Sequence, residues 1–217
     1  MDSFVEIAQP STLHVVSGNM RGGKTLEFLT RMNLVSYRGI PWQLFKPSAD
    51  DGRDLCTADQ IGSRGLFDAT ISVDATVINE EEPATILDNL NIEPYGIIGI
   101  EEVHFFKKPD ALVATVLELR RRGYSILVCG LDRDFRGEPF QPTPTLMAHA
   151  TTIRKYFAAC TFLEDGEPCG DKAEYSQRLI NGEPAPYGDD LIVVGNEDYV
   201  PRCMEHHFVP GKPKFKR

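Results

Sequence analysis

The sequence predicts an α/β protein in which helices flank a mainly parallel sheet. Short apolar segments that suit buried strands alternate with segments of helical periodicity between residues 13 and 131. A glycine-rich loop joins the first predicted strand to the first predicted helix, and the acidic pair Glu101-Glu102 ends a central apolar segment. Strands that alternate with helices in this way favour parallel pairing with right-handed crossovers.

The expected elements follow one another along the chain. Residues 13–16 predict a buried strand, and apolar side chains recur at helical spacing over residues 26–35. Residues 48–66 contain several glycines and aspartates and predict a long loop with at most one short helix. We expect further strands at 42–45 (ended by Lys46-Pro47), 71–73, 95–100 and 124–131, and helices at 84–90 and 109–122.

The glycine-rich loop, GNMRGGKT, fits the pattern G-x4-G-K-[ST] between a strand and a helix. In this pattern backbone N–H groups point at phosphate oxygens, the lysine reaches the β- and γ-phosphates, and the hydroxyl ligates Mg²⁺. The following helix adds the positive end of its dipole. We therefore predict a P-loop (RecA-like) fold that binds a nucleotide with Mg²⁺ through Gly18, Asn19, Met20, Arg21, Gly22, Gly23, Lys24 and Thr25.

The acidic pair follows a strand that we expect to lie in the centre of the sheet. Ligands of open α/β sheets bind beside the carboxyl ends of the strands. One carboxylate there suits the Mg²⁺ sphere, and its neighbour suits a general base. Adjacent strand residues point to opposite faces, so Glu101 and Glu102 should have different roles. The alternative is a solvated acidic strand end.

After about residue 150 the apolar segments shorten, and cysteines, prolines and glycines become frequent. We predict a nucleotide-binding α/β domain at 1–150 and a small loop-rich domain at 151–217. Thiolates and an imidazole suit tetrahedral Zn²⁺, although scattered reduced cysteines are the alternative. The predicted ligands are Cys160, Cys169, Cys203 and His206, with His207 as the alternative to His206 and with Cys56 and Cys129 as non-ligands.

The net charge of −9 argues against a nucleic-acid polymer as a partner, because such a partner needs clustered cations. The basic residues Lys212, Lys214, Lys216 and Arg217 gather near residue 217, where a solvated, frayed terminus is the simpler interpretation. We see no apolar segment of membrane-spanning length and no signal-peptide pattern at residues 1–6. We expect a cytoplasmic protein with reduced thiols and no membrane partner.

These motifs, in this order, resemble the type II thymidine kinases, a family found in cells and in many DNA viruses and phages. The loop has the family's G-x-M-x-x-G-K-[ST], and IEEVHFF at 100–106 resembles I-D-E-x-Q-F-F. The segment GLDRDFRGEPF at 130–140 is nearly identical to the family motif. Weaker matches are KP at 46–47, DGR at 51–53, SRG at 63–65, K-A-x2-S-x-R at 172–178, VG at 194–195 and Y-x3-C-x2-H at 199–206, so the resemblance covers residues 12 to 207.

The resemblance implies an enzyme that transfers the γ-phosphoryl group of ATP to the 5′-hydroxyl of thymidine or deoxyuridine. Glu102 would be the general base, and Glu101 and His104 would join the ATP site, with Glu101 serving Mg²⁺. A structural Zn²⁺ would close the root of a lasso loop over the nucleoside, and family members are usually homotetramers. The nucleoside would contact Met20, Phe105, Leu131, Phe135, Phe140, Ile192, Val193, Val194, Gly195 and Tyr199.

The chain departs from the family pattern at four places. Glu101 replaces the usual Asp, and His104 replaces the usual Gln and introduces a group that titrates near neutrality. The pair Arg21-Gly22 is unusual, and Arg21 either adds a cation near the transferred group or points to solvent. The spacing Cys160-x8-Cys169 replaces a tight C-x2-C, so a hairpin-like insert is expected between two ligands.

Other interpretations remain open from the sequence. Arg53 and Arg136 either neutralise phosphoryl charge or form surface ion pairs. A P-loop ATPase of the strand-exchange or motor type, with Glu102 activating water, fits the loop and the acidic pair but explains neither residues 130–140 nor the Cys/His set. A zinc-bearing module that holds nucleotide without catalysis is disfavoured by the intact Lys24, Thr25 and Glu102.

Overall fold

The computed structural model describes residues 7–50, 56–64, 70–193 and 198–213. Some predicted sites lie outside the described residues: Arg53, Val194 and Gly195, and the basic residues Lys214, Lys216 and Arg217. Within the described part of the chain, no helix is long and apolar enough to span a membrane.

A six-stranded sheet forms the centre of the molecule, and every neighbouring pair in it is parallel. Its order is β5-β2-β6-β7-β1-β8. This confirms the predicted α/β class with a parallel sheet. The strands are β1 (Leu13–Gly18), β2 (Trp42–Pro47), β5 (Thr76–Ile78), β6 (Ile97–Ile100), β7 (Ser125–Gly130) and β8 (Thr152–Tyr156).

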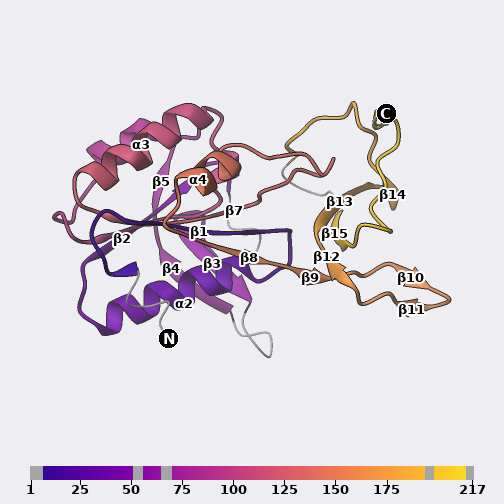
Figure 1. Cartoon of the computed structure of the whole chain (residues 1–217), viewed down its shortest axis with the longest axis horizontal. Coiled ribbons are helices and arrows are strands. Elements are labelled where there is room, and N and C mark those ends of the chain that lie inside the picture. Colours follow the sequence, from indigo (N-terminus) through magenta and orange to yellow (C-terminus); the bar gives the residue numbers. More distant parts are fainter. Residues whose placement is uncertain (1–6, 51–55, 65–69, 194–197, 214–217) are drawn as a thin grey trace.

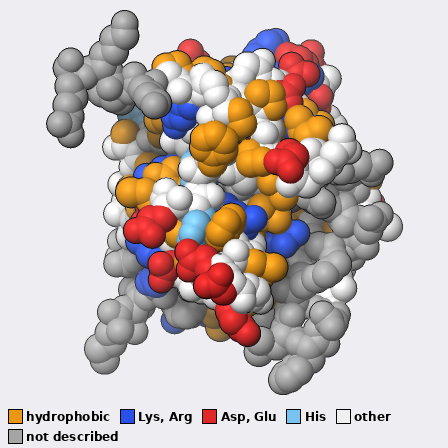
Figure 2. Space-filling model, turned by 90° about the vertical axis from the view of Figure 1, so that its right-hand side faces the viewer, with side chains coloured by type: hydrophobic (Ala, Val, Ile, Leu, Met, Phe, Trp, Pro, Cys, Tyr) orange, Lys and Arg blue, Asp and Glu red, His pale blue; other side chains and the backbone are white. Residues whose placement is uncertain are grey.

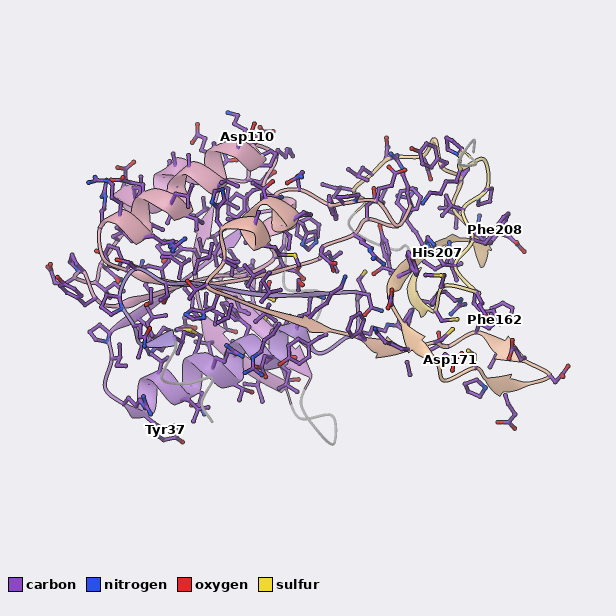
Figure 3. The ribbon with its side chains drawn as sticks, viewed as in Figure 1. Tyr37, Asp110, Phe162, Asp171, His207 and Phe208 are labelled. Carbon is purple, nitrogen blue, oxygen red and sulfur yellow. The ribbon has the colours of Figure 1, made fainter. Side chains whose placement is uncertain are left out.

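Helices cover both faces of the sheet (Figure 1). The helix α2 (Lys24–Tyr37) lies on one face, where it also contacts the antiparallel pair β3 (Gln60–Arg64) and β4 (Thr70–Asp74). The other face carries α3 (Pro109–Arg121), α4 (Thr143–His149) and the 3₁₀ helix η2 (Pro83–Asp88). Figure 3 shows Tyr37 of α2 and Asp110 of α3 on opposite sides of the sheet.

The central strands are apolar without interruption because both of their faces are buried. Ile97 packs with α2, whereas the next residue, Ile98, packs with α3. Leu127 and Val128 of β7 divide in the same way. Alternate side chains of each strand therefore form two separate hydrophobic cores, and each core packs the helices of one face against the sheet.

Several elements differ from their predictions. The predicted loop at 48–66 contains β3, which has only Ile61 as a large apolar residue and therefore no visible alternation. The predicted strand at 71–73 is present within β4, but it belongs to a separate two-stranded sheet. The helix expected at 84–90 is the 3₁₀ helix η2. The three-residue β5 and the seven-residue α4 are too short for a periodicity to emerge, and both went unpredicted.

The end of the molecule beyond β8 is an appendage of short strands (Figure 1). Two hairpin turns, Asp165-Gly166 and Asn181-Gly182, have positive φ at both residues, which suits type I′ turns. Figure 2 views this end and shows apolar and acidic side chains exposed on it. Its strands are β9 (Ala158–Ala159), β10 (Leu163–Glu164), β11 (Glu167–Pro168), β12 (Lys172–Ala173), β13 (Tyr175–Ile180), β14 (Glu183–Pro184) and β15 (Asp198–Arg202).

The strand β8 belongs to the central sheet, so this sheet continues past the predicted domain boundary at residue 150. The division of the chain into domains at 1–150 and 151–217 stays a prediction.

Replacing Gly99 by alanine should destabilise the sheet. An added Cβ would lie 2.4 Å from Leu44 Cδ2 and 2.8 Å from Phe28 Cζ, so the α2 core must shift. Overpacking of this kind costs about 1–3 kcal/mol, which lowers the melting temperature by several degrees. Gly188→Ala is the matched control, because an added Cβ there meets nothing within 4 Å. Equal melting temperatures for the two variants in scanning calorimetry would contradict this packing.

Candidate active site

Three strand ends meet at one edge of the sheet because β6, β7 and β1 are neighbours and parallel. The strand β1 leads into the phosphate loop, β6 leads into Glu101-Glu102, and β7 leads into residues 131–140. All three ends face the appendage (Figure 1). The sheet thus gathers the three motifs that the sequence singled out.

Glycine is required at Gly18 and favoured at Gly23 of the phosphate loop. Gly23 precedes α2 with φ 83°, and Gly18 has φ 138°, where an added Cβ would lie 1.9 Å from Tyr156 O. Lys24 is buried, and its Nζ donates to Asn19 O at 2.9 Å. That bond uses one of three ammonium hydrogens, which leaves donors for phosphate oxygens. Arg21 is exposed, with φ 61°.

The loop is joined to the acidic pair by a direct hydrogen bond. Thr25 Oγ1 donates to Glu101 Oε1 at 2.8 Å, and only 2% of Glu101 is exposed. The longer arm of Glu101, in place of the usual aspartate, therefore reaches the hydroxyl. A hydroxyl and a carboxylate side by side supply the hard oxygen ligands that Mg²⁺ prefers, so these residues fit the predicted metal.

Glu102 differs from Glu101 in both backbone and partners. It has φ 48°, a left-handed conformation that costs a residue with a side chain about 1–3 kcal/mol and that recurs at functional sites. Its Oε2 lies 3.3 Å from His104 Nδ1, and the Leu131 N–H donates to the same nitrogen at 3.2 Å. The same ring nitrogen therefore lies beside both the Glu102 carboxylate and a backbone N–H.

The pKa of the Cys129 thiol, on β7, is affected by charged groups of the phosphate loop and of the acidic pair. Burial and the charge of Glu101 raise the pKa of this thiol well above its usual value, with Glu102 acting in the same direction and Lys24 in the opposite one. This buried thiol is therefore within electrostatic range of groups from both the phosphate loop and the acidic pair. Cys129 itself is fully buried in the core, as predicted for a non-ligand.

The described residues among the predicted nucleoside contacts fall into three groups. Phe105, Leu131 and Phe140 are buried, and the His104 ring lies 4.4 Å from the Phe105 ring and 5.1 Å from the Phe140 ring. Phe135 instead packs in the appendage, in a cluster with Tyr199. The remaining described residues of this set are partly buried or exposed: Met20, Ile192 and Val193.

The phosphate loop is also bonded to the appendage. The Met20 N–H donates to Ser176 Oγ at 2.9 Å, and Asn19 Oδ1 accepts from the Ala158 N–H at 3.1 Å. Asn19 Nδ2 completes the link to Tyr175 O at 3.5 Å. A displacement of the appendage would therefore be transmitted to the phosphate loop through these three hydrogen bonds.

A buried arginine holds the segment that leads toward residue 191. The Arg178 guanidinium lies 4.1 Å above the Phe135 ring and is hydrogen-bonded to the Asp189 carboxylate and the Asp190 carbonyl. Arg136 Nη2 donates to Asp189 O at 2.5 Å. This contact is to a backbone carbonyl, and the role of Arg136 in neutralising phosphoryl charge stays a prediction.

The predicted metal ligands converge. The ligand atoms of Cys160, Cys169, Cys203 and His206 lie within 4.8 Å of one another. Burial opposes the Cys160 thiolate, but hydrogen bonds from the Phe162 and Cys203 backbone lower its pKa. The Asp171 backbone favours the Cys169 thiolate, yet burial and Cys160 outweigh it and raise the pKa of Cys169 to about 11.

The convergence of three sulfur atoms and one imidazole nitrogen gives a donor set that fits Zn²⁺. His207 does not belong to the cluster, because its Nε2 is bonded to Phe135 O at 2.8 Å and its ring stacks on Tyr175. His206 is thus the histidine of the group, as predicted. Figure 3 shows Phe162, Asp171, His207 and Phe208 together in the appendage.

A comparison with protein-family models decides the family. The model described as thymidine kinase matches residues 11–207. The chain belongs to the thymidine kinase family. This membership supports a kinase of the P-loop type, in agreement with the predicted fold and with the resemblance found in the motifs.

Two residues of this thymidine kinase family member that contact the site were not predicted as site residues from the sequence. Ser176 belongs to the motif match at 172–178, but its contact with the loop spans a long sequence separation that the motif does not reveal. Glu164, which contacts His206, lies in the insert between Cys160 and Cys169. The Asp165-Gly166 pair after Glu164 is a hairpin signal that would have placed this residue at a strand end.

Proposed function

We propose that the chain is an ATP-dependent thymidine kinase, which transfers the γ-phosphoryl group to the 5′-hydroxyl of thymidine and yields dTMP. Deoxyuridine is an alternative acceptor of the same chemistry. The observation that carries the proposal is the contact between Thr25 and Glu101, because it brings the phosphate loop against the acidic strand end in a chain of this family.

ATP would bind with its phosphates on the loop at 18–25, against the N-terminus of α2. Lys24 would donate to phosphate oxygens. His104, on the 3₁₀ helix η3 (Val103–Phe105) that follows β6, would adjoin this site. Thr25 and Glu101 would hold Mg²⁺, which neutralises charge on the phosphates. Phosphoryl transfer needs this positioning and charge stabilisation more than covalent chemistry.

Glu102 is the proposed general base. Its carboxylate takes the proton of the 5′-hydroxyl as the hydroxyl oxygen bonds to the γ-phosphorus, while the bond to the β,γ-bridging oxygen breaks and ADP leaves. Only 9% of Glu102 is exposed, and its left-handed backbone separates its direction from that of Glu101. The two adjacent acids can therefore serve the proton and the metal separately.

The aromatic residues would keep water away from the transferred group. Phe105 and Phe140 flank His104 next to the proposed base, and Leu131 is bonded to that same histidine. A dry site favours a sugar hydroxyl over water as the acceptor. This supports a nucleoside kinase over a P-loop ATPase, which needs water at the same place.

The appendage would act as the lid on the nucleoside, with Tyr199 and the segment from Ile192 to Gly195 as the lasso. Cys203 directly follows β15, which holds Tyr199, so a Zn²⁺ on the Cys/His cluster would brace the root of the lasso. The family resemblance supports a homotetramer, and the free cysteines fit a reducing, cytoplasmic setting.

Glu102→Gln should lower kcat for thymidine phosphorylation by a factor on the order of 10² to 10⁴, the usual contribution of a general base. The amide keeps the size of the side chain but does not accept the proton. Glu93→Gln, at an exposed loop residue, is the control and should keep full activity. ATP affinity, measured by calorimetry, should stay within about twofold, because Glu102 serves the acceptor. Near-normal turnover of Glu102→Gln would remove it from the role.

Removal of zinc should weaken thymidine binding more than ATP binding. The Cys/His cluster lies at the root of the lasso, whereas the phosphate loop is built by β1 and α2. Titration calorimetry before and after chelation, with zinc restored as the control, gives both dissociation constants. The proposal for the lasso fails if the two constants change equally or if active protein contains no zinc.

A further inference from the structure

We propose that Glu164 and Phe162 position His206 so that its Nδ1 is the fourth ligand of the metal. Both residues belong to the insert at 161–168, which separates Cys160 from Cys169. This inference rests on the zinc site proposed above. It assigns a function to the segment by which this chain departs from a tight Cys-x2-Cys pair.

The first observation is a hydrogen bond on the far side of the histidine ring. His206 Nε2 lies 2.9 Å from Glu164 Oε1. A carboxylate oxygen accepts, so Nε2 carries the proton and Nδ1 keeps its lone pair. That nitrogen lies 3.2 Å from Cys203 Sγ and 3.6 Å from Cys160 Sγ, so the lone pair is on the side of the thiols.

The second observation fixes the plane of the ring. Phe162 stacks on His206 with 4.2 Å between the ring centroids and 12° between the planes. The Phe162 carbonyl also accepts from the Cys169 N–H at 2.8 Å, so the stacking residue is tied to a second member of the cluster. A ring that is stacked on one face and bonded at Nε2 has little freedom to rotate.

The geometry of the insert explains how one segment makes both contacts. The strands β10 and β11 pair antiparallel, with Leu163 opposite Pro168, and Asp165-Gly166 form the turn. The hairpin therefore returns Cys169 to Cys160 while Phe162 and Glu164 stay beside His206. The hairpin projects away from the rest of the appendage (Figure 1). The wide spacing thus adds support to the cluster instead of weakening it.

A carboxylate behind a ligating histidine fixes its tautomer and increases its basicity, and loss of such a partner usually costs 10- to 100-fold in metal affinity. The Glu164 side chain is 59% exposed, so water can replace part of its contact. We therefore expect the lower end of that range, about tenfold.

The test is a competition titration of the full-length protein with Zn²⁺ and with Co²⁺ against a chromophoric chelator. Glu164→Ala should lower the affinity for both ions about tenfold. Glu164→Gln should lower the affinity less, because the amide oxygen still accepts a hydrogen bond from Nε2. Phe162→Leu removes the stacked ring and should broaden the Co²⁺ absorption bands through a less ordered ligand. Glu167→Ala is the matched control, since Glu167 faces Glu164 across the same hairpin and loses the same charge.

The outcomes separate the inference from the zinc site on which it rests. If the wild-type protein binds neither ion, the proposed metal site itself is wrong. Wild-type protein that binds both, with Glu164→Ala equal to Glu167→Ala, would overturn the positioning role alone. Nitrogen-15 spectra of the zinc-loaded wild type should show the His206 proton on Nε2, and a proton on Nδ1 would also overturn it. Equal melting temperatures of the metal-free variants would show that altered affinity does not come from unfolding.

Discussion

The parallel order β6-β7-β1 is the constraint on which the rest of the structure depends. Parallel neighbouring strands end at the same edge of the sheet. The phosphate loop, the acidic pair and residues 131–140 therefore lie close together in space, although they are far apart in the sequence. The bond between Thr25 and Glu101 then fixes the distance between the loop and β6. Both cores, one on each face, hold these strands in register.

The appendage is bound to this edge at the loop itself. Asn19 and Met20, inside the loop, are bonded to Ala158, Tyr175 and Ser176 of the appendage. The same unit carries the Cys/His cluster and the buried Arg178. The phosphate loop is therefore bonded to the same unit that carries the Cys/His cluster and Arg178.

The sequence was sufficient where the structure depends on local spacing: the strand-loop-helix of the phosphate loop, the acidic pair at a strand end, the apolar strands and the members of the Cys/His cluster. It failed where tertiary contacts decide. The strand β3 has a single large apolar residue, η2 takes 3₁₀ geometry, and Ser176 meets Met20 from far along the chain. Glu164 lies between these cases, because its hairpin turn is local but its contact with His206 needs the folded cluster.

The central claim is that a sugar hydroxyl, and not water, receives the phosphoryl group. The direct measurement follows γ-labelled ATP with the purified protein, a panel of deoxyribonucleosides and ribonucleosides, and a sample without nucleoside. The account predicts label in thymidine or deoxyuridine monophosphate and little phosphate release when nucleoside is left out. Phosphate release at the same rate with and without nucleoside, and no labelled nucleotide product, would contradict it.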